Sequence, residues 1–132
     1  MNVSKKIILT VVGLGVVGGI IFGTTYFINL QKYKKAIQTI SISNNDFSAV
    51  KDGTYKGSYD AMRIAADVSV TVSNHKITDI KLLRHKNERG QGAEIIPQKV
   101  IAAQSLEVDT VTGATNSSKV ILKAIENALQ QK

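Results

Sequence analysis

The chain begins with an apolar segment, and a longer stretch of alternating apolar and polar residues follows it. From Ile7 to Ile28 no residue is charged, and this run is 22 residues long. A helix of that length spans roughly 33 Å, enough to cross a hydrocarbon core of about 30 Å. Lysines flank the run on both sides, and aromatic residues stand near its end, as at membrane interfaces. We therefore predict a transmembrane helix over residues 7–28 that follows a short tail of residues 1–6.

The remainder of the chain predicts a linker and then a small domain. Residues 29–50 are polar and basic, which is typical of a juxtamembrane helix extension followed by a linker. A domain over 51–132 opens with a turn and a short strand at Thr54–Tyr59. In residues 64–73, valines alternate with polar residues at the period of a half-buried strand. After a turn, residues 76–85 return as the second strand of a hairpin or meander.

The C-terminal part of the domain predicts helices. Residues 93–104 have helical composition, with Pro97 near the first turn, where proline is tolerated. Residues 117–130 carry apolar side chains on one helical stripe. The fold class is therefore α+β. We expect a three- to four-stranded, mainly antiparallel sheet packed by helices and preceded by the transmembrane helix.

Charge and cysteine content narrow the classes of function. The chain carries 17 Lys+Arg against 10 Asp+Glu, a formal net charge of +7. Five of the lysines lie in residues 1–35, so residues 36–132 carry a net charge of only +2. Nucleic-acid binding therefore loses its main support, and we expect no nucleic-acid partner. The absence of cysteine excludes disulfides, thiolate metal sites and lipid attachment through cysteine; we expect no metal site.

Two other interpretations of the apolar segment remain to be weighed. Residues 13–18 match G-x-G-x-x-G, but a dinucleotide-binding fold needs a βαβ unit and an acidic residue about 20 positions on, and neither follows. A cleavable signal peptide would have a shorter apolar core and end in small residues. We therefore favour an uncleaved signal anchor. Because a short tail precedes the segment and a long domain follows it, we expect that domain on the extracytoplasmic face, although the flanking charges are nearly balanced.

Glycines recur every fourth residue within the apolar segment, at Gly15, Gly19 and Gly23. Such a stripe permits close packing of two helices, and hence a helix-mediated homo-oligomer. Glycine is also common in membrane helices for no such reason, and this simpler explanation is slightly preferred.

Residues 109–118 form the segment best suited to bind a ligand. Six of its ten side chains carry hydroxyl or amide groups, and the segment leads directly into the last predicted helix. Gly113 and Ala114 leave room for a bulky group near the backbone. Amide groups at a helix N-terminus attract an anion, and Asn116, Ser117 and Ser118 could add donors. A bound phosphate would also offset the unfavourable position of Lys119 in the first turn.

A capping turn without any ligand is the alternative for this segment. Asn116 or Ser117 would then be the N-cap of the helix, and Lys119 would simply be solvated. Residue spacing alone favours this simpler interpretation.

The sequence resembles the FMN-binding domain family, and this resemblance favours a phosphate site over a capping turn without a ligand. The pattern Asp109-x-x-Thr112-Gly113-Ala114-Thr115 is similar to the family signature. The opening strand at residues 52–57, the hairpin and the last helix also resemble the family, so the likeness covers roughly residues 52–129. The family includes flavin-carrying subunits of sodium-translocating NADH:quinone reductase and of Rnf-type complexes.

The resemblance implies specific roles for these residues. In members with covalent flavin, a flavin transferase joins the FMN phosphate to the hydroxyl at the position of Thr115. Thr112, Gly113 and Ala114 match the residues before it, and Asp109 matches an acid that the transferase needs. Glu88 stands where the family pocket often has a Glu-Thr pair, but Arg89 follows it here.

His85 also stands where many family members have a histidine. We expect it to be an exposed loop histidine with no role in binding.

The resemblance therefore implies a membrane-anchored, extracytoplasmic flavoprotein that carries FMN as its cofactor and transfers electrons. Its expected partners are the membrane, a flavin transferase, and a redox donor and acceptor that the sequence does not identify. Two alternatives remain open: a domain that binds FMN reversibly or has lost it, acting as an anchored interaction or sensor module, and a purely structural anchored domain. The chain contains no other redox group.

Overall fold

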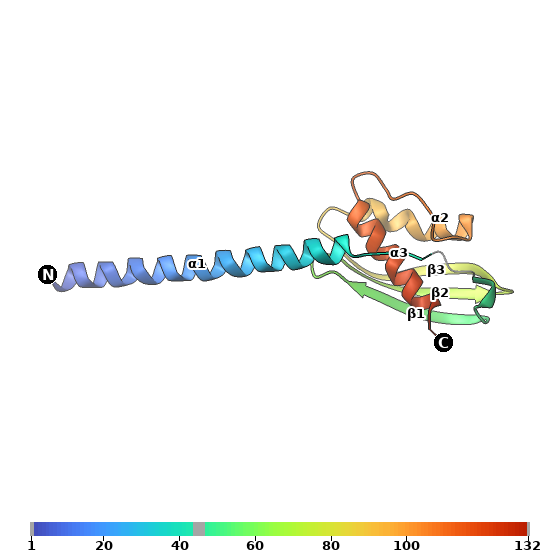
Figure 1. The fold of residues 1–132 in the computed structure, drawn as a ribbon, viewed down its shortest axis with the longest axis horizontal. Helices are drawn as coiled ribbons and strands as arrows, with labels where there is room; N and C mark the ends of the chain where they lie inside the picture. The colour runs from blue at the N-terminus through green and yellow to red at the C-terminus, as the bar shows by residue number, and fades with distance from the viewer. Residues whose placement is uncertain (1, 44–46, 132) are drawn as a thin grey trace. The chain divides into compact units, whose positions relative to one another are not determined.

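The computed structural model describes residues 2–43 and 47–131, and its chain forms two compact units, Met1–Lys35 and Ala36–Lys132. Asn44, Asn45 and Asp46 of the predicted linker lie outside the described residues. The elements in chain order are α1 (Val3–Gln38), η1 (Phe47–Ala49), β1 (Gly53–Asp60), β2 (Ala65–Ser73), β3 (Lys76–Lys86), η2 (Gln91–Ile95), α2 (Ile96–Ala103) and α3 (Thr115–Leu129) (Figure 1). The predicted α+β class is confirmed.

Helix α1 contains the predicted transmembrane segment and extends beyond it at both ends. It has 36 residues, and the apolar side chains from Ile7 to Ile28 are exposed. Among the described residues, it is the one helix long and apolar enough to cross a membrane. The apolar run ends at Ile28, but nothing breaks the helix there, so the backbone continues through the lysine-rich segment to Gln38.

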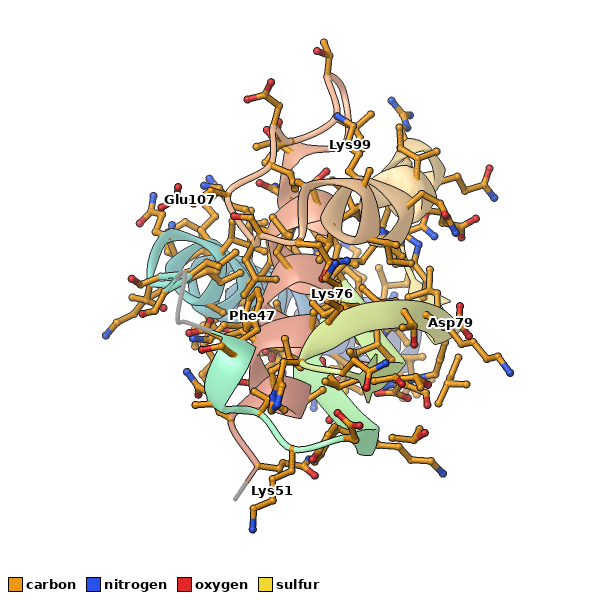
Figure 2. All side chains as sticks on the ribbon, turned by 90° about the vertical axis from the view of Figure 1, so that its right-hand side faces the viewer. Phe47, Lys51, Lys76, Asp79, Lys99 and Glu107 are labelled. Carbon is orange, nitrogen blue, oxygen red and sulfur yellow. The ribbon has the colours of Figure 1, made fainter. Side chains whose placement is uncertain are left out.

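The sheet has three antiparallel strands in the order β1-β2-β3. Val68, Val70 and Val72 of β2 are buried, while the residues between them are half-buried, as the alternation predicted. Helix α3 packs on β1 and β2, and α2 packs on β3 and α3. Figure 2 shows α3 near the centre of the domain, with the Lys51 side chain pointing outward.

Helix α3 supplies most of the helical core. The predicted stripe is buried on this helix; its members are Val120, Ile121, Ala124, Ile125, Ala128 and Leu129. The helix lies so close to β1 that Gly57 is required at the contact, because an added Cβ would overlap Ala124 O and Ala128 N and would lie 2.7 Å from Ala128 Cβ. This close contact fixes α3 on the sheet and thereby positions its N-terminus, where residues 109–118 end.

Candidate functional site

The predicted ligand segment, residues 109–118, is a turn that leads into the start of α3. The helix begins at Thr115, and its N-cap is Ala114, which makes no side-chain capping bond. The expectation that Asn116 or Ser117 caps the helix is therefore wrong. Thr115 is instead the first helical residue, and its side chain is exposed.

The turn before Thr115 leaves open space above the backbone. Gly113 has φ +81, a left-handed conformation that favours glycine, and apart from its two chain neighbours no described residue has an atom within 4 Å of the place where its Cβ would be. Ala114 N donates to Val111 O at 2.9 Å, which closes the turn. A bulky group can therefore approach the backbone next to the Thr115 hydroxyl.

Ser118 holds the turn against the helix. Its hydroxyl donates to Ala114 O at 2.7 Å and accepts a hydrogen bond from Val111 N at 3.1 Å. The residue is fully buried. Ser118 thus links the two ends of the turn and does not extend its hydroxyl toward the open space.

The start of α3 has the character of an anion site. Its first helical hydrogen bond runs from Ser118 N to Ala114 O at 2.9 Å, so the amides of residues 115–117 precede the helical ladder. Amides in these positions and the helix dipole both favour a negatively charged group. Because the helix starts at Thr115, Lys119 is its fifth residue and lies beyond the first turn, contrary to our expectation.

Asp109 and Thr112 lie on the exposed side of the turn. Lys99 of α2 donates a hydrogen bond from Nζ to the backbone carbonyl of Asp109 at 3.2 Å. The Asp109 carboxylate takes no part in this hydrogen bond. Asp109, Thr112, Thr115 and Asn116 are all exposed in this turn and at the start of α3.

Ser117 faces the other way, into the domain. It is 1% exposed, and its Oγ has no hydrogen-bond partner among the described residues. It packs on Gly90, where an added Cβ would overlap Ser117 Oγ and would lie 2.6 Å from Ser117 Cβ. Residue spacing could not reveal this contact, because 27 positions separate the two residues.

His85 is not the exposed loop histidine that we expected. It lies within β3, and its side chain is only 2% exposed. Its Nδ1 lies 3.2 Å from Glu94 Oε1 and 3.4 Å from Asn87 Nδ2, and the other ring nitrogen is Nε2. That Nε2 is buried and has no partner among the described residues.

Glu88 lies in the loop after β3, and its carboxylate pairs with Arg63 at 3.6 Å. Its described contacts include none with residues 109–118. The described contacts therefore do not link the Glu88 carboxylate with the open turn, and the Ser117 and Ser118 side chains, which are buried, do not face it either.

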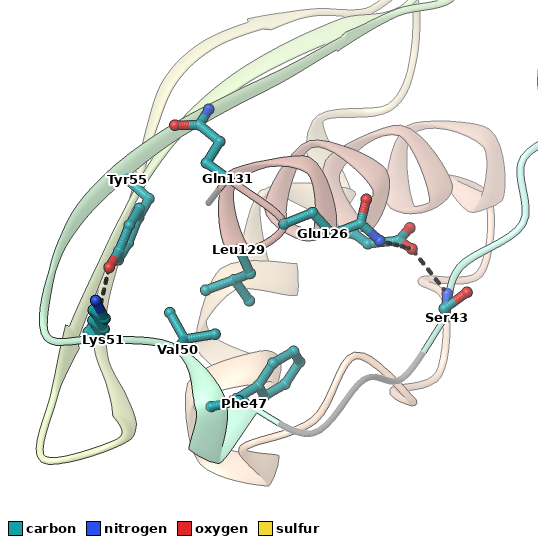
Figure 3. A pocket seen from close by; sticks show the side chains of 10 residues that line it. Ser43, Phe47, Val50, Lys51, Tyr55, Glu126, Leu129 and Gln131 are labelled. Carbon is teal, nitrogen blue, oxygen red and sulfur yellow. Dashed lines mark hydrogen bonds between the residues drawn. The ribbon is translucent and has the colours of Figure 1, made fainter.

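A separate cavity of about 670 Å³ lies at the other end of α3 (Figure 3). Phe47, Val50 and Leu129 form apolar walls, and the Glu126 carboxylate accepts a hydrogen bond from Ser43 N at 3.2 Å. Thr115 and Leu129 stand at opposite ends of α3, roughly 21 Å apart along the helix axis. The cavity is therefore distinct from the site at the helix start.

Comparison with known protein families identifies the class of this domain. A model of the FMN-binding domain family matches residues 63–130, slightly more than half of the 132-residue chain. The chain therefore belongs to the FMN-binding domain family, and FMN is its cofactor. The resemblance seen in the sequence is confirmed.

Two relatives match parts of the chain. An uncharacterized protein of Treponema pallidum (strain Nichols) is 31% identical over 85 residues, which are 62% of this chain and 24% of that protein. NADH:acrylate oxidoreductase of Vibrio harveyi is 38% identical over 65 residues, which are 47% of this chain and 6% of that protein. The matched regions thus span a quarter or less of each relative's length.

The described residues fit a flavin nucleotide. The phosphate is suited by three features of this turn: exposed hydroxyls, amides at the helix start and the open space at Gly113. Ser117, which is buried beside them, is uncharged and does not repel the phosphate. FMN would supply the isoalloxazine ring, which accepts one or two electrons.

Proposed function

We propose that this chain is a membrane-anchored flavoprotein that carries FMN through a phosphoester on Thr115 and relays electrons at the extracytoplasmic face. The observation that carries the attachment site is the position of Thr115. It is the first residue of α3, its side chain is exposed, and it follows the open turn at Gly113. Its hydroxyl is thus accessible to a transferase and lies where a phosphate is favoured.

The attachment is a phosphoryl transfer to the Thr115 oxygen. This oxygen attacks the flavin-side phosphorus of a flavin dinucleotide, the P–O–P bond breaks, and a nucleoside monophosphate leaves. The hydroxyl proton passes to a base. The exposed Asp109 carboxylate on the same turn is the acid we assign to transferase recognition. Thr112 and Asn116 border the phosphate, and the backbone of Gly113 and Ala114 leaves space for it.

The electron-carrier role follows from the cofactor. The chain has no cysteine and no second redox group, so a tethered flavin would be its electron carrier. The relative from Vibrio harveyi is named as an oxidoreductase, and the matched part is a small fraction of it. A small matched region of this kind is consistent with a module that carries electrons between a donor and an acceptor on other proteins or domains.

The attachment is tested by denaturation of the full chain after co-expression with a flavin transferase. We expect flavin fluorescence to stay with the polypeptide in acid and detergent, and the intact mass to rise by one FMN. Thr115→Ala should abolish both signals, whereas Thr115→Ser, which keeps a hydroxyl, should retain them. Thr54→Ala, an exposed threonine on β1, is the matched control and should behave as wild type.

A second, known acceptor protein in the same cells shows that the transferase is active. If that acceptor is labelled and the wild-type chain releases all its flavin, the covalent attachment is refuted and reversible FMN binding replaces it. Flavin retained by Thr115→Ala would refute the site.

The side of the membrane is tested with a single introduced cysteine. The chain has no native cysteine, so Lys81→Cys on exposed β3 gives a unique thiol. We expect a membrane-impermeant maleimide to label it in intact cells. Labelling that appears only after lysis would place the domain inside.

A further inference from the structure

The loop that joins β3 to η2 is held by the ion pair of Glu88 with Arg63 and by the side chain of Asn87. Its Oδ1 accepts a hydrogen bond from Gly90 N at 3.0 Å. On its other side, Gly90 O accepts a hydrogen bond from Ala93 N at 2.9 Å, which starts η2. Both backbone groups of Gly90 are therefore engaged, and the residue is buried. The position of Gly90 depends on Asn87 from the N-terminal side and on η2 from the C-terminal side.

Gly90 in turn contacts the first turn of α3. The Ser117 side chain occupies the place where a Cβ on Gly90 would be. Ser117 is the third residue of α3, two positions after Thr115. Because Ser117 Oγ has no hydrogen bond of its own among the described residues, this buried side chain is held by packing, and Gly90 is part of that packing. A displacement of Gly90 therefore changes the support under the residue that would carry the flavin.

We propose that Asn87 is a positioning residue for the flavin site and acts on Thr115 through Gly90 and Ser117. The proposal deepens the function proposed above and rests on attachment at Thr115. The 87–90 loop holds the first turn of α3 in the geometry that the phosphate and the transferase require.

The physical reason lies in the buried amide of Gly90. Without the Asn87 oxygen, that N–H loses its partner, and a buried unpaired donor is strongly unfavourable. The loop relieves this cost by moving Gly90 toward water and away from Ser117. The first turn of α3 then opens more often, while the remainder of the helix stays fixed by its close contact with β1 at Gly57.

The test compares Asn87→Ala with Asn87→Asp and with a matched control in the full chain. Asn87→Asp keeps an oxygen acceptor for Gly90 N. The control is Asn127→Ala, which also deletes a side-chain hydrogen bond to backbone, here from Asn127 Nδ2 to Ser58 O at 2.9 Å. Asn127 lies in the last part of α3, far from Thr115 along the helix.

Two measurements are made on each variant. The first is hydrogen exchange of the amides in residues 113–118, followed by mass spectrometry in the chain without flavin. The second is the initial rate of FMN attachment by the transferase. For Asn87→Ala we expect exchange about tenfold faster and attachment about tenfold slower than in wild type. Asn87→Asp should restore both to within about twofold, and Asn127→Ala should leave both unchanged.

The outcomes separate this proposal from the function on which it rests. Equal effects of Asn87→Ala and Asn127→Ala, or no restoration by Asn87→Asp, would overturn the positioning role. If the wild-type chain accepts no FMN while a known acceptor does, the proposed function fails. In that case, unchanged exchange in Asn87→Ala also overturns the contact pathway, and faster exchange supports it independently of flavin.

Discussion

Replacing Gly90 with alanine tests the contact between the 87–90 loop and α3. Gly90 has φ −100 and ψ 16, in the bridge region that alanine can also occupy, so the substitution introduces little backbone strain. The new Cβ would lie 2.6 Å from Ser117 Cβ and closer still to Ser117 Oγ, whereas ordinary contacts begin at 3.4 Å. The two segments must therefore separate by roughly 1 Å in a closely packed interior.

The expected loss of stability is about 2 kcal/mol, in the range measured when a methyl group is forced into a packed core. For a domain of this size, that lowers the melting temperature by roughly 8–16 °C. The measurement is thermal unfolding by far-ultraviolet circular dichroism of the full chain in detergent micelles. The Gly90→Ala variant should also accept FMN more slowly, because Ser117 lies two residues after Thr115.

A double substitution separates this contact from a general disturbance. Ser117→Gly removes both atoms that the new Cβ would strike and by itself costs roughly 0.5 kcal/mol through helix propensity. Combined with Gly90→Ala, it should cost little more than that, which gives a coupling of about 2 kcal/mol. If the effects of Gly90→Ala and Ser117→Gly simply add, the contact is not the source of the loss.

Three further substitutions probe other parts of the domain. Gly57→Ala places a Cβ against the backbone of α3, so we expect a loss of at least about 3 kcal/mol in thermal unfolding, and no single side-chain change in α3 should restore it. Gly113→Ala meets open space and only the strain of φ +81, so its cost should be about 1 kcal/mol; a loss like that of Gly57→Ala would contradict the open turn. Glu126→Gln removes the negative charge of the carboxylate that accepts hydrogen bonds from Ser43 N and Lys123 Nζ. We expect a loss of stability of about 2 kcal/mol and faster hydrogen exchange in residues 40–43. Unchanged exchange there would show that the bond to Ser43 does not hold this segment.

Much of the fold follows from local patterns in the sequence. The valine alternation in β2 and the apolar stripe of α3 predicted those elements to within about two residues, because each pattern reflects which side faces the core. The start of α3 was missed. Polar residues at Asn116 and Ser117 suggested a cap, but the Ser118 hydroxyl bridges Val111 and Ala114, which lets the helix begin at Thr115.

The sequence indicates which residues adjoin one another in a turn, but it does not show contacts between residues that are far apart in the chain. Residues 109–118 stand together in the chain, and the phosphate site proposed there depends on the family resemblance, because residue spacing alone favours a capping turn without a ligand. The burial of His85 depends on Glu94 and on the elements that cover β3, so the sequence around His85 could not show it. The contact of Gly90 with Ser117 likewise arises only when the loop and α3 pack together.

The exposed position of Thr115 at the start of α3 has a consequence for whether FMN is attached before or after the domain folds. Under the proposed attachment, the acceptor hydroxyl is already accessible in the folded domain, so loading needs no partial unfolding. The turn that presents Thr115 exists only when Ser118 has joined Val111 to Ala114 and when α3 lies on β1. An enzyme that recognises this turn would attach FMN to folded molecules and not to misfolded ones. Cofactor insertion would thus act as a checkpoint on folding.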